Sequence, residues 1–204
     1  MNNVKTVVVV QGPTNCDFVP VIRQSWEDVP IIFSTWEGTD SNCYETSDTV
    51  IFNKQPDKTG PANFNLQRVS SLNGFLKAKE LGYSRVVKMR SDFSVKNPHG
   101  FLDLCKKDCI TFYAFVEHEG GYVADFLMEG DIDEMIELFT IDKMPSFPEQ
   151  GFTKRLFELG LNKKCNFIWN KLSKQGVDLY WKKYDYWMSG NIGKSGWKDF
   201  INER

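Results

Sequence analysis

The feature that most constrains the fold is a predominantly apolar run near the start of the chain, Val4 to Val10, which ends in four consecutive valines. β-branched side chains favour extended backbone. A strand without polar alternation is typical of a strand that is covered on both faces. Such strands belong to parallel sheets with helices on either side. We therefore expect this run to form a central strand of a layered α/β domain.

Strand and helix patterns alternate from this run to about residue 92. Turn residues separate the segments, and the helix patterns repeat apolar residues at helical spacing. This alternation predicts right-handed strand–helix–strand units, and so an α/β fold with a mostly parallel central sheet flanked by helices. The expected strands are 4–10, 30–35, 49–52 and 85–89, and the expected helices are 17–26 and 65–81.

The rest of the chain has a less regular pattern, without repeats or a clear linker. One domain is therefore the simplest prediction. Asp131 is the expected cap of one helix, and Pro98 lies in the first turn of another. The expected helices are 97–107, 131–139, 148–159 and 165–174, and the expected strands are 110–115, 121–126 and 177–184.

Composition and charge narrow the class of protein. The chain has 204 residues, 41% of them hydrophobic and 25% charged, which is ordinary for a soluble globular protein. A net charge of -2 gives no electrostatic reason to expect nucleic acid as a partner. The valine run is too short for a signal-peptide core or a membrane span. We expect a cytoplasmic protein without a membrane span, either whole or part of a longer chain.

The cysteines are five in number and irregularly spaced. An odd number in such a pattern indicates neither a disulfide framework nor a zinc site. Small, buried, apolar side chains are the expected role, and free cysteines favour a reducing compartment. The five are Cys16, Cys43, Cys105, Cys109 and Cys165.

The polar residues within and just after the expected strand at 85–89 indicate a ligand-binding site. Side-chain alternation places Lys88 and Arg90 on the same face of the strand. Asp92 follows directly, at the edge where open α/β sheets bind their ligands. Cations beside a single acid suit a phosphate-bearing ligand together with a divalent metal. The alternatives are a solvated strand face for the cations and a turn cap for Asp92.

The turns after the other parallel strands would lie at the same edge of the sheet. They offer exposed backbone, an indole and cations, which suit a base, a ribose and a diphosphate. Gly12 is not part of a GxGxxG pattern and no Walker lysine follows it, which argues against dinucleotide and P-loop folds. The residues expected to contact such a ligand are Gln11, Gly12, Thr14, Thr35, Trp36, Arg68, Lys88, Arg90 and Ser91.

Several of these segments resemble a known family. Together they are similar to the WavE-type glycosyltransferases of surface-polysaccharide synthesis, over about residues 6–152. The size also resembles the N-terminal glycosyltransferase domain of a chlorella-virus glycan enzyme, which would act in the host cytoplasm. The matching segments are 32–38, the helix positions Asn65, Arg68 and Ser71, the segment 88–92, Asp125 and the segment 148–150.

The resemblance implies a GT-A fold, a nucleoside-diphosphate sugar donor, with UDP as the expected nucleotide, and a divalent metal such as Mn²⁺ or Mg²⁺. The family's metal motif is Asp-x-Asp, whereas this chain has Arg90, Ser91 and Asp92 and keeps only the last acid. Asp92 is therefore the expected metal ligand, with water filling other positions. The single domain, 1–204, would have a nucleotide-binding half of about 1–95 and an acceptor and catalytic half of about 96–204.

Glycosyl transfer also needs a carboxylate near the reacting carbon, as base, nucleophile or electrostatic stabiliser. Asp125, expected at the end of a strand, and Glu149, at the start of a helix, are the candidates. Each has a structural alternative, because Asp125 could cap a turn and Glu149 suits a helix N-terminus.

The function predicted from the sequence is metal-assisted transfer of a sugar from a nucleoside diphosphate to a hydroxyl of a glycan acceptor. One alternative is a nucleotidyltransferase that acts on sugar phosphates, although the glycine-rich basic loop of that class is missing after the first strand. The other is a non-catalytic carbohydrate-binding domain, in which Trp36, Trp181 and Trp187 would stack on sugars.

Overall fold

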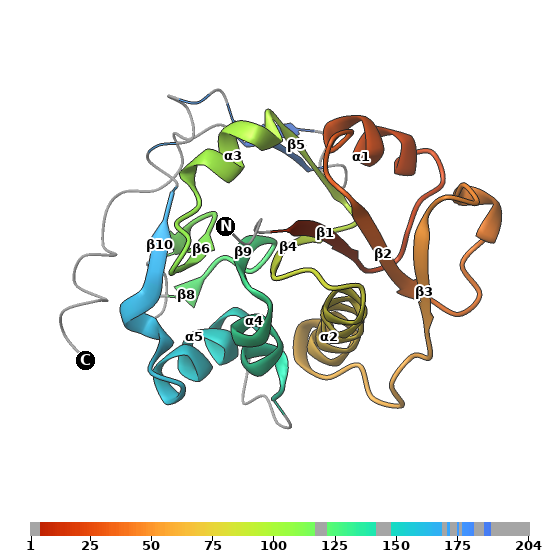
Figure 1. Ribbon diagram of the computed structural model, residues 1–204. Helices are drawn as coiled ribbons and strands as arrows, with labels where there is room; N and C mark the ends of the chain where they lie inside the picture. Colours follow the sequence, from red (N-terminus) through yellow and green to blue (C-terminus); the bar gives the residue numbers. More distant parts are fainter. Residues whose placement is uncertain are drawn as a thin grey trace.

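A seven-stranded sheet forms the centre of the protein (Figure 1). The computed structural model describes residues 5–116, 122–141, 148–168, 171, 175, 177–181 and 186–188. The strand order is β10-β6-β9-β4-β1-β2-β3. The strands are β1 (Thr6–Gln11), β2 (Ile31–Trp36), β3 (Thr49–Asn53), β4 (Arg85–Arg90), β6 (Ile110–Phe112), β9 (Leu127–Asp131) and β10 (Cys165–Phe167).

The direction of the strands confirms the predicted class, an α/β fold with a mostly parallel central sheet. Neighbouring strands are parallel except at β9, which runs antiparallel to both β4 and β6. Because β9 is reversed, it begins where the parallel strands end, and Leu127 at its start pairs with Met89 near the end of β4. The segment before β9 therefore reaches the carboxyl edge of the sheet.

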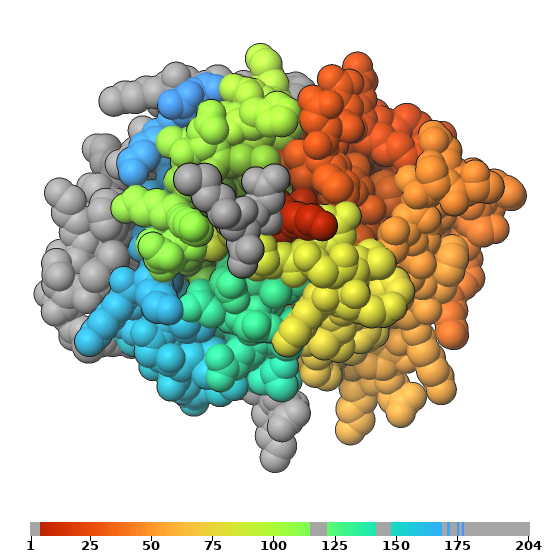
Figure 2. Space-filling view, in the orientation of Figure 1, coloured from red at the N-terminus to blue at the C-terminus, as the bar shows by residue number. Residues whose placement is uncertain are grey.

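Helices cover both faces of the sheet (Figure 1). The helices α2 (Phe64–Glu80), α4 (Ile132–Phe139) and α5 (Pro148–Glu158) lie on one face. In the space-filling view of Figure 2, α2 and α4 are side by side. The other face carries α1 (Val19–Ser25), α3 (Pro98–Leu104) and a small sheet of β5 (Phe93–Lys96), β11 (Asp178–Trp181) and β12 (Tyr186–Met188).

Shorter elements connect these layers. The strands β7 (Phe115–Val116) and β8 (Tyr122–Val123) form a two-stranded sheet. Single 3-10 turns occur at η1 (Ser41–Cys43), η2 (Pro61–Asn63) and η4 (Leu161–Lys164).

The valine run lies at the centre of the sheet, as predicted. Val7 and Val9 point into the core beneath α2, α4 and α5, and Val8 and Val10 point into the core on the other face. The helix α2 approaches β1 closely at Gly74, where an added Cβ would lie 2.3 Å from Val9 Cγ1. Glycine is therefore required at this helix position despite its low helix propensity.

Three predictions for the second half of the chain are wrong. The helix predicted at 165–174 is wrong at its start, where residues 165–167 form the strand β10, because they pair with β6 and Phe167 stacks on Phe112. Residues 169, 170 and 172–174 of this prediction lie outside the described residues. The predicted strand at 121–126 is reduced to β8, and the following strand, β9, was not predicted. The predicted strand at 110–115 ends at Phe112.

The helices at 131–139 and 148–159 are confirmed within a residue as α4 and α5. Asp131 is the cap of α4, as predicted, and its Oδ1 accepts a hydrogen bond of 2.9 Å from the backbone N–H of Asp133. The helix predicted at 97–107 ends early, as α3, at Leu104.

The cysteines differ from the prediction in one respect, and the inference of a reducing compartment, which rested on free cysteines, loses its support. Cys16 and Cys43 form a disulfide, which links the loop after β1 to the loop after β2. Cys105, Cys109 and Cys165 are free. Burial raises the pKa of the Cys105 and Cys165 thiols, so both stay protonated, in line with the predicted structural role. No helix in the described part of the chain is both long and apolar enough to cross a membrane.

Candidate functional site

A cavity of about 550 Å³ opens at the carboxyl edge of the parallel strands. Its walls come from the turns after β1 and β4, the end of β2, the segment that leads into α2, the residue Asp125 before β9, and the first turn of α5. This is the edge at which open α/β sheets bind ligands. The lining residues are Gln11, Gly12, Pro13, Trp36, Gln55, Ala62, Asn63, Leu66, Gln67, Arg90, Ser91, Asp92, Asp125, Pro148 and Glu149.

The turns after β1 and β4 are joined by hydrogen bonds. The Ser91 N–H donates to the Gln11 carbonyl oxygen at 2.9 Å, and Ser91 Oγ donates to the Pro13 carbonyl oxygen at 2.7 Å. Gly12 has φ +114°, and an added Cβ there would lie 3.1 Å from Ser91 Oγ. The backbone at Gly12 therefore requires glycine both for its conformation and for its contact with Ser91.

A buried polar network supports this wall of the cavity from behind. Ser70 Oγ, on α2, lies 2.9 Å from Gln11 Oε1 and donates to it. Ser34 Oγ donates to the Ser70 carbonyl oxygen at 2.6 Å, and Asn53 Nδ2 donates to Ser34 Oγ at 2.9 Å. The network fixes the side chain of Gln11, and it joins the ends of β1, β2 and β3 to α2.

Arg90 and Asp92 form a bidentate ion pair inside the cavity. Arg90 Nε donates to Asp92 Oδ1 at 2.9 Å, and Nη2 donates to Oδ2 at 2.6 Å. The two side chains are 33% and 30% exposed, so solvent or a ligand can reach both. The guanidinium also lies over the ring of Phe93, with Cζ 5.3 Å from the ring centroid.

Lys88 and Asp125 form a second ion pair, which is buried. Lys88 Nζ donates to Asp125 Oδ2 at 2.9 Å and also to the Asp125 carbonyl oxygen. Gln67, on α2, donates to the same carboxylate oxygen. Desolvation lowers the pKa of Lys88, and the charge of Asp125 opposes that effect. Lys88 is fully buried, does not line the cavity and binds Asp125, so its predicted contact with a ligand phosphate gains no support from the geometry and stays a prediction.

Glu149 lies in the first turn of α5, where it lines the cavity as predicted. Burial raises the pKa of its carboxyl, and the negative charge of Asp125 raises it further. Its backbone is fixed because Thr153 Oγ1 donates to the Glu149 carbonyl oxygen at 2.7 Å and accepts from the Val123 N–H at 3.0 Å. Glu149 is thus a carboxyl whose protonation is suited to proton transfer nearer neutral pH.

Most of the predicted site residues meet at this cavity. Asp125 does so for a reason other than the predicted one, because it precedes the antiparallel β9 instead of ending a strand. Gly12 and Trp36 line it from the ends of β1 and β2. The predicted residues that line the cavity are Gln11, Gly12, Trp36, Arg90, Ser91, Asp92, Asp125 and Glu149.

Four predicted contacts lie outside the lining. Lys88 is one of them. Thr35 is buried and its Oγ1 lies 3.0 Å from Thr39 Oγ1. Thr14 is half-buried in the loop that follows Pro13, and Arg68 does not line the cavity although its helix contributes Gln67.

The cavity-lining residues that precede α2 or lie within it were not predicted from the sequence. Ala62 and Asn63 have left-handed backbone, with φ +45° and +62°, which is uncommon for residues other than glycine. Gln55 and Gln67 add carboxamides to the same wall. The apolar spacing of this helix did not show which side meets the sheet: the buried side includes Ser70, Ser71 and Gly74, whereas Leu76 is exposed. Gln67 could therefore not be singled out.

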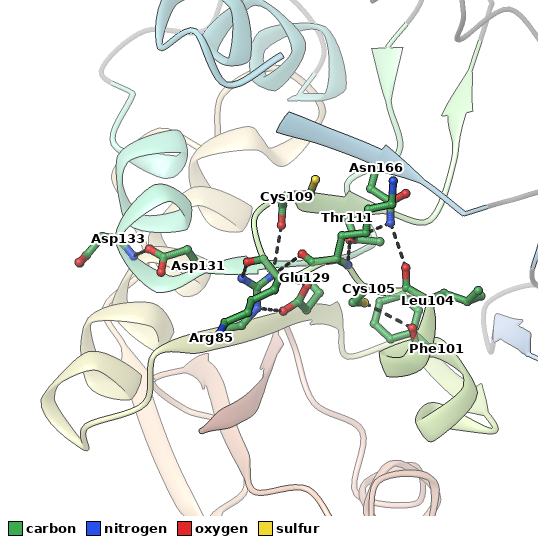
Figure 3. Close-up of polar contacts among 12 residues, drawn as sticks. Arg85, Phe101, Leu104, Cys105, Cys109, Thr111, Glu129, Asp131, Asp133 and Asn166 are labelled. Atoms are coloured by element: carbon green, nitrogen blue, oxygen red, sulfur yellow. Dashed lines mark hydrogen bonds and ion pairs between the residues drawn. The ribbon is translucent and has the colours of Figure 1, made fainter. Parts of the chain in front are cut away.

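Arg85, at the opposite end of β4, belongs to a separate structural cluster (Figure 3). Its Nη2 donates to Glu129 Oε2 at 2.8 Å and to the Cys109 carbonyl oxygen at 3.1 Å. Nearby, Asn166 Nδ2 donates to the Leu104 carbonyl oxygen at 3.0 Å. These contacts hold β4, β9, β10 and the loop after α3 together, at a distance from the cavity.

The carboxylates that line the cavity could supply a bound metal ion with only one or two protein ligands. Among the residues that the structure describes, three candidate ligand atoms lie within 4.8 Å of one another only at Cys16, Asp40 and Cys43, and the two sulfurs there form the disulfide. The cavity instead has the separate carboxylates of Asp92, Asp125 and Glu149. Asp92 is more accessible to a cation than Asp125, because its side chain is 30% exposed, whereas that of Asp125 is 2% exposed and bound by Lys88 and Gln67. This set fits a metal that also binds phosphate and water.

Comparison with known proteins finds similarity in three-dimensional structure but none in sequence families. No protein-family model matches the sequence, and no curated protein matches it. The resemblance to the WavE-type family and to a viral enzyme therefore has no support from sequence comparison and stays a hypothesis. Among solved structures, the chain is similar to a protein proposed to be a nucleotide-diphospho-sugar transferase, from Desulfovibrio desulfuricans, with TM-score 0.49, 12% identity and coverage of 79% of this chain and 78% of that one.

A second similar structure is a mannose-1-phosphate geranyltransferase from Thermus thermophilus. It has TM-score 0.45 and 8% identity, and the match covers 74% of this chain and 68% of that one.

Proposed function

We propose that the protein is a transferase that moves a sugar from a nucleoside-diphosphate donor, with UDP as the expected nucleotide, to a hydroxyl of a glycan acceptor. The observation that supports this most directly is the convergence of Arg90, Asp92, Asp125 and Glu149 in one cavity at the carboxyl edge of the parallel strands. The cavity has the size of a small-molecule site, which is typically about 300–1,000 Å³. A GT-A fold and a cytoplasmic location belong to the same proposal.

The two walls of the cavity suit the two halves of a donor. Trp36 and Gln11, at the ends of β2 and β1, would meet the base and the ribose. Arg90 would bind the diphosphate through its planar guanidinium. Asp92 would hold a divalent cation, Mn²⁺ or Mg²⁺, whose chemistry is to neutralise charge on the leaving diphosphate.

The two remaining carboxyls suit the transfer step. The acceptor oxygen forms a bond to the anomeric carbon, the bond from that carbon to the diphosphate breaks, and the hydroxyl proton passes to a carboxylate. Glu149 suits the role of proton acceptor because its pKa is raised. Asp125, which accepts hydrogen bonds from Lys88 and Gln67, would stabilise positive charge as it develops on the sugar ring.

Ligand binding tests this proposal first. Thermal unfolding of the purified protein with UDP, GDP, ADP and CDP, each with and without Mn²⁺, should show a rise in Tm for one nucleotide with the cation. Asp92→Asn should remove most of that rise. The exposed Asp133→Asn, on α4, is the matched control and should keep it. If no nucleoside diphosphate shifts the Tm of the wild type, the proposed function is wrong.

Product analysis separates the proposed transferase from its alternatives. Incubation with a panel of nucleotide sugars should release the nucleoside diphosphate, slowly to water and faster when an acceptor glycan is added. A nucleotidyltransferase would instead form a nucleotide sugar and pyrophosphate from a nucleoside triphosphate and a sugar phosphate. A carbohydrate-binding domain would do neither. Of the tryptophans expected for that role, Trp36 lines the cavity, and the side chains of Trp181 and Trp187 lie outside the described residues.

A further inference from the structure

The positive charge of the cavity is paired before any ligand enters. Arg90 is the one cation among the lining residues that the structure describes, and Asp92 accepts hydrogen bonds from it on both carboxylate oxygens. Lys88, on the same strand, is 0% exposed and bound to Asp125. A diphosphate brings at least two negative charges, so it cannot be neutralised here unless an existing pair is exchanged or a cation is added.

Of the two ion pairs, only the one between Arg90 and Asp92 can exchange. Both of its side chains are about one-third exposed in the cavity. A pair of this exposure contributes little to stability, because solvent screens its charges. The pair between Lys88 and Asp125 is shielded from water, and breaking such a buried pair is strongly unfavourable, because it leaves an uncompensated charge. A diphosphate presents oxygens that match the guanidinium as well as a carboxylate does.

We propose that Arg90 blocks Asp92 in the free protein, and that the donor diphosphate draws Arg90 away and makes the Asp92 carboxylate available to the divalent cation. This inference rests on the proposed function, because it assumes a diphosphate ligand. Its consequence is ordered and cooperative binding: the cation binds weakly to the free protein and tightly once the nucleotide is present. By linkage, the cation strengthens nucleotide binding by the same factor.

The backbone around this pair favours a change confined to side chains. Ser91, between the two residues, is fixed by hydrogen bonds to the carbonyl oxygens of Gln11 and Pro13. The guanidinium lies over the ring of Phe93, and it can keep this contact while it rotates toward a phosphate. The exchange therefore needs no movement of the β4 turn.

Binding of Mn²⁺ in the absence of nucleotide tests the proposal without any measurement of activity. Titration followed by electron paramagnetic resonance gives the dissociation constant. Arg90→Gln removes the blocking group, and it should lower that constant by roughly fivefold, the equivalent of about 1 kcal/mol. Asp92→Asn added to Arg90→Gln should abolish the gain. Arg23→Gln removes the same charge from a pair with Asp48 outside the cavity, and it should leave Mn²⁺ binding in the cavity unchanged.

The wild type supplies the second half of the test. Saturating UDP should lower the dissociation constant for Mn²⁺ by about tenfold or more, and by a smaller factor in Arg90→Gln, where the block is already absent. Equal Mn²⁺ affinity of wild type and folded Arg90→Gln without nucleotide would overturn the inference while leaving the proposed function intact. Absence of UDP binding by the wild type would instead remove the proposed function. If Arg90→Gln does not fold, Arg90→Lys, which keeps the charge but loses the bidentate fork, should show a smaller gain.

Discussion

Lys88 Nζ and Asp125 Oδ2 lie 2.9 Å apart in an ion pair that is almost completely shielded from water, with the two side chains 0% and 2% exposed. The lysine comes from the middle of a central strand, and the aspartate lies at the floor of the cavity. A buried charge needs its partner, because the interior cannot solvate it. The pair therefore ties the position and the charge of a cavity carboxylate to the core of the sheet.

Removal of the lysine charge should destabilise the protein and disturb the cavity together. Lys88→Met is expected to lower the free energy of unfolding by about 3–5 kcal/mol, because Asp125 would be left buried without its cation. Urea unfolding measures this change. Arg85→Met, at the buried pair with Glu129 on the far end of β4, is the matched control. It should be destabilising without weakening nucleotide binding, whereas Lys88→Met should weaken both stability and binding. Equal binding by the two variants would contradict the role given to Lys88.

Gly12 offers a test of the turn that joins β1 to β4. Gly12→Ala should lower stability by about 1–3 kcal/mol, because alanine is strained at φ +114°. It should also weaken nucleotide binding, because the new methyl group would press on Ser91 Oγ. Gly38→Ala is the matched control: its φ is +87° and an added Cβ has nothing within 4 Å. Gly38→Ala is therefore expected to lose stability and keep its affinity, as measured by calorimetry.

The centre of the fold could be predicted from sequence because a short run of consecutive apolar residues is enough to indicate a buried strand there. Four valines in a row permit few structures other than a strand with both faces covered, and their alternation between two cores follows from the period of a strand. The same period predicted that Lys88 and Arg90 share a face. It could not predict that α2 and α4 seal that face at Lys88 and leave Arg90 within reach of the cavity, since that depends on how far each helix extends over the sheet.

The parts of the site that sequence could not predict depend on contacts between distant segments. Asp125 reaches the cavity because β9 pairs in reverse between β4 and β6, and no residue near Asp125 indicates that direction. The role of Gln67 depends on how α2 packs on the sheet, because that packing brings its side chain to Asp125. The disulfide joins two loops whose cysteines are 27 residues apart, and irregular spacing gave no sign that these loops meet.

This disulfide makes stability sensitive to reductant. Closure of a loop between residues 27 apart in the chain stabilises the folded state by about 3–4 kcal/mol in the chain-entropy account. Urea unfolding with and without a phosphine reductant should show a loss of that order for the wild type. The double variant Cys16→Ser, Cys43→Ser should start at the lower stability and show no response to the reductant. A wild type that is equally stable in both conditions would contradict this prediction.

Glu149 should make stability depend on pH in a way that its neutral analogue does not. Its folded pKa is raised above its ordinary value of 4.5, by burial first and by the charge of Asp125 second. The folded state therefore binds more protons than the unfolded state between pH 4.5 and the raised pKa, and stability falls as pH rises through that window. The contribution of Glu149 is thus fully present below its ordinary pKa and lost above the folded pKa. The loss is at most about 1.4 kcal/mol for each pH unit that separates the two pKa values, and solvent screening at this partly exposed carboxyl reduces it.

Glu149→Gln removes this titration, so the variant should gain stability relative to the wild type as pH rises from about 4 to about 8. The midpoint of urea unfolding across this range measures the difference. Glu158→Gln, at the exposed end of the same helix, controls for the loss of one negative charge. If Glu149 is also the proton acceptor in transfer, Glu149→Gln should gain stability at neutral pH and lose turnover, while donor binding is retained. A variant that is less stable than the wild type at the alkaline end of the range would show that the carboxyl is not destabilised by its surroundings.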